Sequence, residues 1–178
     1  CCQVYCGQGS GAAYATEQSD AAVEATEGQR LYYDGDLVQD AVYHSSNGGA
    51  TEDAENVWGS CRGYLLGKED PYEALIDIPN YRWSVTYTAD QLTWILQQKN
   101  YDIGKVENVY VSAVTAAGNV AAVTFEDTRG KTLTVKGDTA RTVFYSSTYQ
   151  KSVPGLRFTI NGGAGGESVT VGGGFTVN

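Results

Sequence analysis

Alternating apolar and polar residues dominate the second half of the chain. Successive side chains of a strand point to opposite faces of a sheet, so this alternation is typical of strands with one buried face. It predicts strands over residues 81–87, 106–115, 120–126, 131–135 and 157–160. Gly118 and Gly130 lie between consecutive runs and favour turns. We therefore expect antiparallel hairpins.

Helical spacing is clearest over residues 89–98. Thr88 and Gln91 have the spacing of a capping box, in which each side chain bonds the backbone N–H of the other residue. The apolar residues that recur at helical intervals are Leu92, Ile95 and Leu96. This segment is predicted to be a helix with one buried face.

Three shorter helices are expected, each behind a residue that can cap it. The first ends near Thr26 and is capped by Ser19 or Asp20. The second covers residues 52–57 behind Thr51, and the third covers residues 138–145 and is capped by Asp138. Together with the hairpins, they predict an α+β fold, β-rich, with antiparallel hairpins and three or four short helices.

The remaining segments are read from their turn residues. Asp34-Gly35 predicts a hairpin turn between strands over 30–33 and 37–43. Residues 60–80 predict a long ordered loop, and loops of that length often carry function. The Gly-rich tail, 161–178, leaves a β-hairpin and a flexible segment open, beside one main domain over 1–160.

The charge of the chain limits its partners. The sequence has 12 Lys and Arg against 21 Asp and Glu, a formal net charge of −9. Binding to a nucleic-acid backbone or to an anionic lipid surface requires clustered positive charge, so no nucleic-acid partner is expected. Neutral glycans and cationic groups remain as ligands.

Three of the four cysteines lie at the start of the chain, as Cys1, Cys2 and Cys6. The Cys2-x-x-x-Cys6 spacing occurs in zinc sites. In a secreted domain, a disulfide such as Cys6–Cys61 is an equal alternative.

The segment AVYHSSNGGATEDAENVWG, residues 41–59, holds the densest group of reactive side chains. Its Gly48-Gly49 pair lets the backbone approach a ligand closely. Trp58 beside hydroxyls and carboxylates resembles a sugar site in kind, because aromatic faces stack on sugar C–H surfaces. The alternative is that these residues only form turns, caps and core.

The segment contains two candidate catalytic arrangements. His44 and Ser46 would share one face of a strand, so a hydrolytic dyad is one interpretation, and structural hydrogen bonds of the lone His are the alternative. Glu52 and Glu55 would share one face of a helical turn. Glycosidase carboxyls usually face each other across the scissile bond, so two carboxyls on one turn favour hydrogen bonding and helix-end electrostatics instead.

The same segment closely resembles the signature of the SpoIID/LytB domain, which reads Ser-Ser/Thr-x-Gly-Gly-x-Thr-Glu-x-Ala-Glu-x-Val-Trp-Gly after an aromatic residue and His or Ser. Gln3-Val4-Tyr5 resembles the family's Gln-Val-Tyr run, and Gly155-Leu156-Arg157 resembles its closing motif. Pro71-Tyr72 resembles its Pro-Tyr/Trp-Asp region, with Glu73 in place of Asp. The resemblance covers about residues 2–160.

The resemblance implies a peptidoglycan lytic transglycosylase that cleaves MurNAc–GlcNAc bonds in the glycan strands. A protonated carboxylic acid acts on the glycosidic oxygen, and the muramyl 6-hydroxyl closes the ring. Sporulating relatives act with a cell-wall amidase. The residues expected near substrate are Gln3, Tyr5, His44, Ser45, Ser46, Gly48, Gly49, Thr51, Glu52 and Trp58.

The family's catalytic Glu is expected upstream of Cys1, so no catalytic residue is predicted within this chain. A non-catalytic wall-binding module or amidase activator is the alternative function. Some relatives bind zinc, which makes Cys1, Cys2 and Cys6 candidate ligands, although no cofactor is required. The implied location is extracytoplasmic, in the cell envelope.

Overall fold

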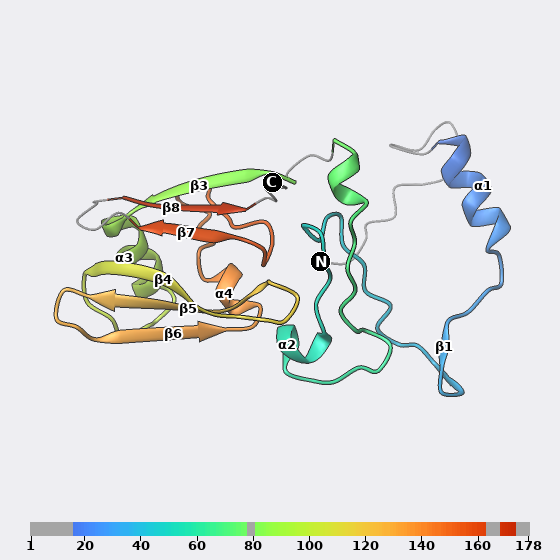
Figure 1. The fold of residues 1–178 in the computed structure, drawn as a ribbon, viewed down its shortest axis with the longest axis horizontal. Coiled ribbons are helices and arrows are strands. Elements are labelled where there is room, and N and C mark those ends of the chain that lie inside the picture. Colours follow the sequence, from blue (N-terminus) through green and yellow to red (C-terminus); the bar gives the residue numbers. More distant parts are fainter. Residues whose placement is uncertain (1–15, 78–80, 163–167, 174–178) are drawn as a thin grey trace. The chain divides into compact units, whose positions relative to one another are not determined.

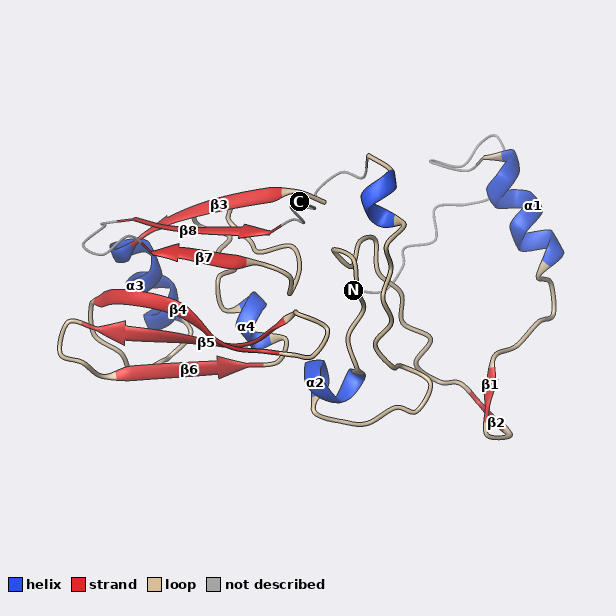
Figure 2. Ribbon diagram, viewed as in Figure 1, coloured by secondary structure: helices blue, strands red, loops and turns tan. Residues whose placement is uncertain are grey.

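The computed structural model describes residues 16–77, 81–162 and 168–173. The chain divides into two compact units, Cys1–Val42 and Tyr43–Asn178. Figure 1 labels most of the helices and strands of both units, and Figure 2 colours them by secondary structure. The two three-stranded sheets, the hydrophobic core and the polar segment of residues 44–59 all belong to the second unit.

In its described part, the first unit contains the helix α1 (Glu17–Ala25). The Thr16 side chain accepts a hydrogen bond from the backbone N–H of Ser19, and the Ser19 side chain accepts one from the N–H of Thr16. This capping box corrects the predicted cap at Ser19 or Asp20. It forms because residues three apart can satisfy two orphan N–H groups reciprocally.

A short hairpin follows, with β1 (Tyr32–Tyr33) and β2 (Asp36–Leu37) in antiparallel pairing. Asp34 and Gly35 have φ of 52° and 88°, the positive values that a type I′ turn requires. The predicted turn is confirmed. The strands are shorter than predicted, and their residues are exposed, so no buried face extends the pairing.

The second unit contains two antiparallel sheets of three strands each, in the orders β3-β8-β7 and β4-β5-β6. The strands are β3 (Trp83–Thr88), β4 (Val106–Val114), β5 (Val120–Asp127), β6 (Thr132–Lys136), β7 (Thr159–Gly162) and β8 (Ser168–Gly173). The tail therefore contributes β8, which pairs with both β3 and β7. The β-rich α+β class is confirmed.

The helix α3 (Ala89–Gln98) has the predicted bounds and contacts both β3 and β4. Its predicted capping box is present, since Thr88 and Gln91 exchange side chain to backbone bonds of 3.1 Å. Asn100 follows the end of the helix with φ of 61°. Local capping and an apolar face agree here, which explains why the sequence predicted this element well.

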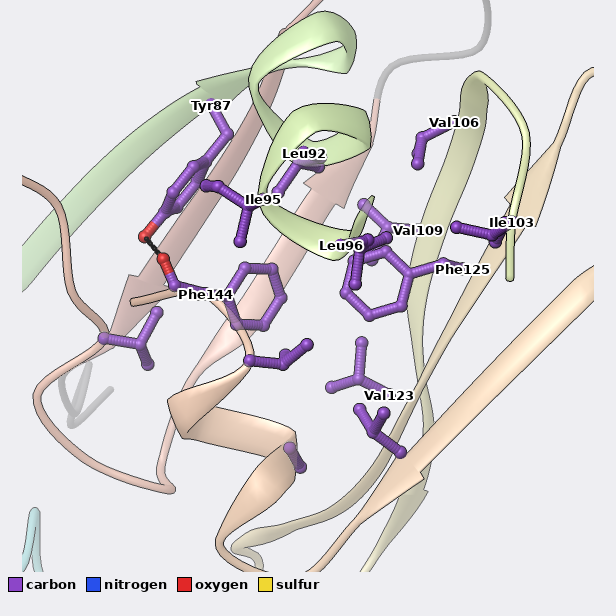
Figure 3. Close-up of a cluster of buried hydrophobic side chains, with 14 of the residues drawn as sticks. Tyr87, Leu92, Ile95, Leu96, Ile103, Val106, Val109, Val123, Phe125 and Phe144 are labelled. Atoms are coloured by element: carbon purple, nitrogen blue, oxygen red, sulfur yellow. Dashed lines mark hydrogen bonds between the residues drawn. The ribbon is translucent and has the colours of Figure 1, made fainter. Parts of the chain in front are cut away.

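The core lies where α3 meets the two sheets, as Figure 3 shows. Its largest fully buried side chains include Tyr87, Phe125, Phe144, Leu92, Ile95 and Leu96. The Tyr87 hydroxyl donates to the carbonyl oxygen of Phe144 at 3.0 Å, drawn as a dashed line in Figure 3. Burial raises the pKa of Tyr87, so the hydroxyl stays protonated and remains a donor.

The other helices of the second unit are short. They are α2 (Ala54–Trp58), the 3₁₀ helix η2 (Glu73–Leu75) and α4 (Thr139–Thr142). The predicted helix over 138–145 is thus reduced to α4, and Asp138 makes no side-chain cap but accepts from Arg141. Within residues 16–77, 81–162 and 168–173, no helix has the length and apolarity needed to cross a membrane.

Candidate functional site

The bend of residues 44–49 folds around the carboxylate of Glu73, which η2 supplies. Glu73 Oε1 accepts from the backbone N–H of Asn47 at 2.8 Å. Glu73 Oε2 accepts from the N–H of Gly48 at 2.8 Å and from the Ser46 hydroxyl at 3.2 Å. Glu73 is only 8% exposed. Hydrogen bonds to a carboxylate are among the strongest in proteins, so Glu73 holds the shape of this bend.

The Asn47 side chain connects the bend to its neighbours. Its Oδ1 accepts from the N–H of Gly49 at 2.7 Å, and its Nδ2 donates to Asp70 Oδ2 at 2.9 Å. The same Nδ2 lies 3.2 Å from His44 Nε2. Both the oxygen and the nitrogen of this amide therefore contribute contacts that organise the bend.

Asp70 is the second carboxylate that accepts a hydrogen bond from the bend. The hydrogen bond from Asn47 is the main reason that the pKa of Asp70 lies below its ordinary value, and the backbone N–H groups of Tyr72 and Glu73 act in the same direction. A low pKa keeps Asp70 ionised at neutral pH. An ionised carboxylate only accepts, which agrees with its contact to the Asn47 amide.

The residues after the bend pair with the loop that carries Asp70. Ala50 and Glu69 form an antiparallel bridge. The N–H of Thr51 donates to the Lys68 carbonyl at 2.8 Å, and Thr51 Oγ1 accepts from the N–H of Lys68 at 2.8 Å. The predicted role of Thr51 as a helix cap is wrong, because its hydroxyl serves this pairing and Asp53 occupies the N-cap position of α2.

Glu52 ties the segment to the turn between β4 and β5. Its Oε2 accepts from Thr115 Oγ1 and from Asn119 Nδ2, the latter at 3.0 Å. Its Oε1 accepts from the N–H of Asp53 at 3.1 Å and from Asn56 Nδ2 at 2.8 Å. The carboxylate thus bridges two segments that are far apart in the sequence.

These contacts also set the charge of Glu52. Partial burial acts to raise its pKa, but the hydrogen bonds from Thr115, Asn56 and Asn119 outweigh that effect and lower it. Glu52 is therefore ionised at neutral pH. The predicted shared helical face with Glu55 is wrong, because α2 begins only at Ala54 and Glu52 precedes it.

Arg157 links the bend to the same β4–β5 turn. A Cβ at Gly48 would lie 3.3 Å from Arg157 Cβ, and Gly48 has φ of +69°. Arg157 Nη1 donates to the carbonyl of Ala117 at 2.9 Å. Only glycine combines this φ with such a close approach at low cost, so Gly48 allows the bend to pack against Arg157.

Trp58 lies at the end of α2, which Gly59 terminates with φ of 76°. The Val57 carbonyl accepts from the N–H of Asp138 at 3.1 Å, and this bond attaches the end of the helix to the segment after β6. The Trp58 side chain is 57% exposed. The alternative of a core role for Trp58 is therefore wrong.

His44 and Ser45 are exposed, whereas Ser46, Gly48, Gly49, Thr51 and Glu52 are half-buried. Gln3, Tyr5, Cys1, Cys2 and Cys6 lie outside the described residues. Cys61 is an exposed free thiol. Among the described residues, no group of three or more His, Cys, Asp or Glu is placed to hold a metal ion.

The structure gives His44 and Ser46 different partners. The Ser46 hydroxyl donates to Glu73, and His44 Nε2 contacts the Asn47 amide. Residues 41–47 also form no strand, so the predicted common strand face of His44 and Ser46 is wrong. A nucleophilic serine needs a base within hydrogen-bond reach, and Ser46 donates instead to a structural carboxylate.

Sequence reasoning missed the residues that organise the bend, namely Asn47, Asp70, Glu73, Thr115, Asn119 and Arg157. A signal existed for two of them. Glu73 and Arg157 both lie in motifs that resemble the SpoIID/LytB pattern, and the structure brings those motifs to the bend at Gly48. Asn47 lies within the segment of residues 41–59 but was not singled out there. Asp70, Thr115 and Asn119 had no sequence signal because their contacts with this segment span 23 to 67 residues.

Comparison with known proteins gives one informative match. Over 95 residues, which make up 53% of this chain, the sequence is 37% identical to the amidase enhancer of Bacillus subtilis (strain 168). The chain spans 12% of the length of that curated relative. No protein-family model and no solved structure matches the chain. Over half its length, the chain is therefore similar to a protein named for enhancing an amidase.

Proposed function

We propose that the protein containing these residues promotes hydrolysis of the bacterial cell wall by enhancing an amidase, and that the bend of residues 44–49 contacts peptidoglycan glycan strands. The observation that carries this proposal is the 37% identity over 95 residues to an amidase enhancer. The proposal implies a location in the cell envelope, outside the cytoplasm, and requires no cofactor.

Exposed aromatic side chains within residues 43–58 and on the partner loop support contact with a neutral sugar polymer. The exposed aromatic side chains at this segment and its partner loop are Tyr43, Trp58 and Tyr72, at 63%, 57% and 73% exposure. Aromatic faces stack on the C–H surfaces of sugars, and the exposed His44 and Ser45 add hydrogen-bonding groups. Glycans carry no phosphate, so the net charge of −9 does not oppose their binding.

Within this proposal the predicted site residues divide by exposure. His44, Ser45 and Trp58 contact the glycan, whereas Ser46, Thr51 and Glu52 shape the bend through internal hydrogen bonds. Gly48 and Gly49 allow close approach of the backbone. Gln3 and Tyr5 stay predicted substrate contacts, and Cys1, Cys2 and Cys6 stay predicted zinc ligands.

Cleavage of glycan strands is a second candidate function, favoured by the resemblance of residues 41–59 to the SpoIID/LytB signature. Such cleavage needs a carboxylic acid that is protonated at working pH. The lowered pKa of Glu52 makes it unsuited to that role. We therefore assign no general acid among the described carboxylates of the bend, whose proposed contribution is to bind the strand.

The direct test measures retention of the full chain on purified peptidoglycan sacculi, together with release of stem peptides by a purified cell-wall amidase. We expect retention and a faster amidase reaction. Trp58→Ala should reduce both, whereas Tyr110→Ala, which removes another exposed aromatic residue from β4, should change neither.

Absence of retention, together with an unchanged amidase rate, would contradict the proposal. Anhydro-ended fragments released by the chain without an amidase would favour the second candidate function. Equal losses for Trp58→Ala and Tyr110→Ala would show that the contact surface lies elsewhere.

A further inference from the structure

We propose that Asn47-Gly48 is a deamidation site that the fold keeps unreacted, because Glu73 binds the Gly48 nitrogen, and that conversion of Asn47 to aspartate destabilises the bend. This inference concerns the covalent chemistry of the chain itself. It does not depend on the proposed function.

Asn-Gly is the dipeptide with the least hindered route to deamidation. Glycine has no side chain, so the nitrogen that follows the asparagine can approach the amide carbon freely. The chain contains this dipeptide twice, at residues 47–50 and 161–164, which both read Asn-Gly-Gly-Ala. The second copy is an internal standard for the first, because two identical contexts have the same intrinsic reactivity.

The reaction begins when the backbone nitrogen of Gly48 loses its proton and attacks Cγ of Asn47. A bond forms between this nitrogen and Cγ, and the bond from Cγ to Nδ2 breaks. Nδ2 keeps its two hydrogens, takes up the proton and leaves as ammonia, so a cyclic imide remains. Water then opens the imide and gives aspartate or isoaspartate. No oxidant or reductant takes part.

The structure opposes the first step at the Gly48 nitrogen. The Gly48 N–H donates to Glu73 Oε2 at 2.8 Å, and Glu73 is only 8% exposed. A hydrogen bond to the protonated form of a group favours that form, so the Glu73 carboxylate opposes loss of the Gly48 proton. Oε1 of the same carboxylate accepts from the Asn47 N–H at 2.8 Å, which fixes the backbone on both sides of Asn47.

The Asn47 side chain is also poorly placed to lose ammonia. Its Nδ2 donates to Asp70 Oδ2 at 2.9 Å, and mainly because of this bond the pKa of Asp70 lies below its ordinary value. Asp70 is therefore ionised and has no proton to supply to the leaving nitrogen. The Gly49 N–H, 2.7 Å from Oδ1, polarises the amide and acts the other way, but attack cannot begin before Glu73 releases Gly48.

Deamidation would replace a donor of the bend by a negative charge. An aspartate at position 47 only accepts hydrogen bonds, and its carboxylate would face Asp70, which Nδ2 of Asn47 contacts at 2.9 Å. Two ionised carboxylates in contact repel each other. Water does not reverse the reaction, so the bend would lose its bond to Asp70 permanently.

The test follows deamidation of the full chain at pH 8.5 by mass spectrometry of tryptic peptides. Asn47 and Asn161 fall in different peptides, because Arg62 and Arg157 lie between them. In guanidinium chloride we expect equal rates at the two sites. In native buffer we expect Asn47 to react at least about tenfold more slowly than in denaturant, since the bend must open first.

Glu73→Gln removes the carboxylate that binds the Gly48 N–H. We expect it to raise the rate at Asn47 about tenfold in native buffer and to leave the rate in denaturant unchanged. Glu69→Gln, on an exposed residue of the same loop, removes the same charge and should leave both rates unchanged.

Hydrogen exchange of the Gly48 amide in the wild type gives a second measurement that needs no variant. Exchange also requires that this N–H leave Glu73. Its protection factor should therefore equal the slowing of deamidation at Asn47 within about threefold.

Asn47→Asp supplies one product of the reaction directly. We expect it to lower the Tm by at least about 2 °C. Ser60→Asp adds the same charge at an exposed position just after α2, and should change the Tm by less than about 1 °C.

Reaction of Asn47 in native buffer at its rate in denaturant, or an unchanged rate in Glu73→Gln, would overturn the protection by Glu73. A Gly48 amide that exchanges as fast as in an unfolded chain would do the same. Equal Tm values for Asn47→Asp and the wild type would overturn the effect of deamidation on the bend.

Discussion

The core of the second unit and the bend around Glu73 are stabilised by different interactions. Around α3, fully buried apolar side chains such as Phe125 and Phe144 pack with ring centroids 5.6 Å apart. At the bend, carboxylates and amides replace apolar groups, and Glu73 receives three hydrogen bonds from residues 46–48. The core is stabilised by removing apolar side chains from water, and the bend is stabilised by directional hydrogen bonds.

This difference shows that the fold and the shape of the bend depend on different physical interactions. Apolar burial is not directional, so it stabilises the sheets without fixing any particular polar group. Hydrogen bonds are directional, so the network of residues 46–49 can hold the bend in one arrangement. Substitutions in the two regions should therefore differ in what they damage.

The largest effect is expected for Phe144→Ala. The side chain is fully buried and contacts the rings of Tyr87, Phe125 and Phe158, so its loss leaves a cavity. We expect the free energy of unfolding to fall by about 3–5 kcal/mol, measured by chemical denaturation. Leu75→Ala, at a side chain that is 77% exposed, should change it by less than about 0.5 kcal/mol.

Glu73→Gln tests the polar region. The substitution places an amide nitrogen, which donates, against N–H and O–H groups that also donate. We expect a loss of about 1–3 kcal/mol in the free energy of unfolding, and a change in the NMR signals of the His44 ring. Glu69→Gln, on an exposed residue of the same loop, is the matched control and should leave both unchanged.

An unchanged His44 spectrum in Glu73→Gln would show that the bend keeps its shape without the carboxylate. The bend would then not depend on polar geometry, and the two regions would not differ in the way described.

Asp127 extends the comparison to the turn between β5 and β6, where a buried carboxylate also receives backbone N–H groups. Desolvation acts to raise its pKa, but bonds from Arg129, Lys131 and Gly104 outweigh it and lower the pKa from 3.8 to about 2. A lowered folded-state pKa contributes stability above pH 3.8, and that stability is lost as pH falls toward 2.

We therefore expect the Tm of the wild type to fall more steeply than that of Asp127→Asn between pH 4 and pH 2, followed by circular dichroism. The difference between the two curves isolates Asp127 from other acidic groups with lowered pKa values, such as Asp70 and Asp102. Parallel curves would show that this carboxylate does not link folding to pH.

The smallest effect is expected for Thr51→Val, which removes the acceptor of the Lys68 N–H. This N–H is exposed to solvent and can bond water instead, so the loss should be about 0.5–1 kcal/mol. Thr132→Val, at an exposed position of β6, controls for the change of side chain. A loss as large as that of Glu73→Gln would show that the strand-like pairing, rather than Glu73, holds the segment.

The fold could be predicted best where the capping residues and the apolar pattern of a segment indicate the same element. For α3, the Thr88–Gln91 capping box and the buried Leu92 agree, and its predicted bounds are the observed ones. Predictions were weaker where a side chain had two possible partners. Thr51 and Asp138 both have cap chemistry, yet each bonds a different group, because a nearby loop or arginine competes for the oxygen.

The sequence by itself determined the strand pattern, the α3 helix, the I′ turn at Gly35 and the composition of the polar segment, because each depends on residues close together along the chain. Only the tertiary structure decided that Glu73 occupies the bend, that Glu52 joins the β4–β5 turn and that Arg157 packs on Gly48. Such contacts depend on which loops the sheets bring together. The type of a hydrogen-bonding side chain does not indicate which residue, many positions away, will be its partner.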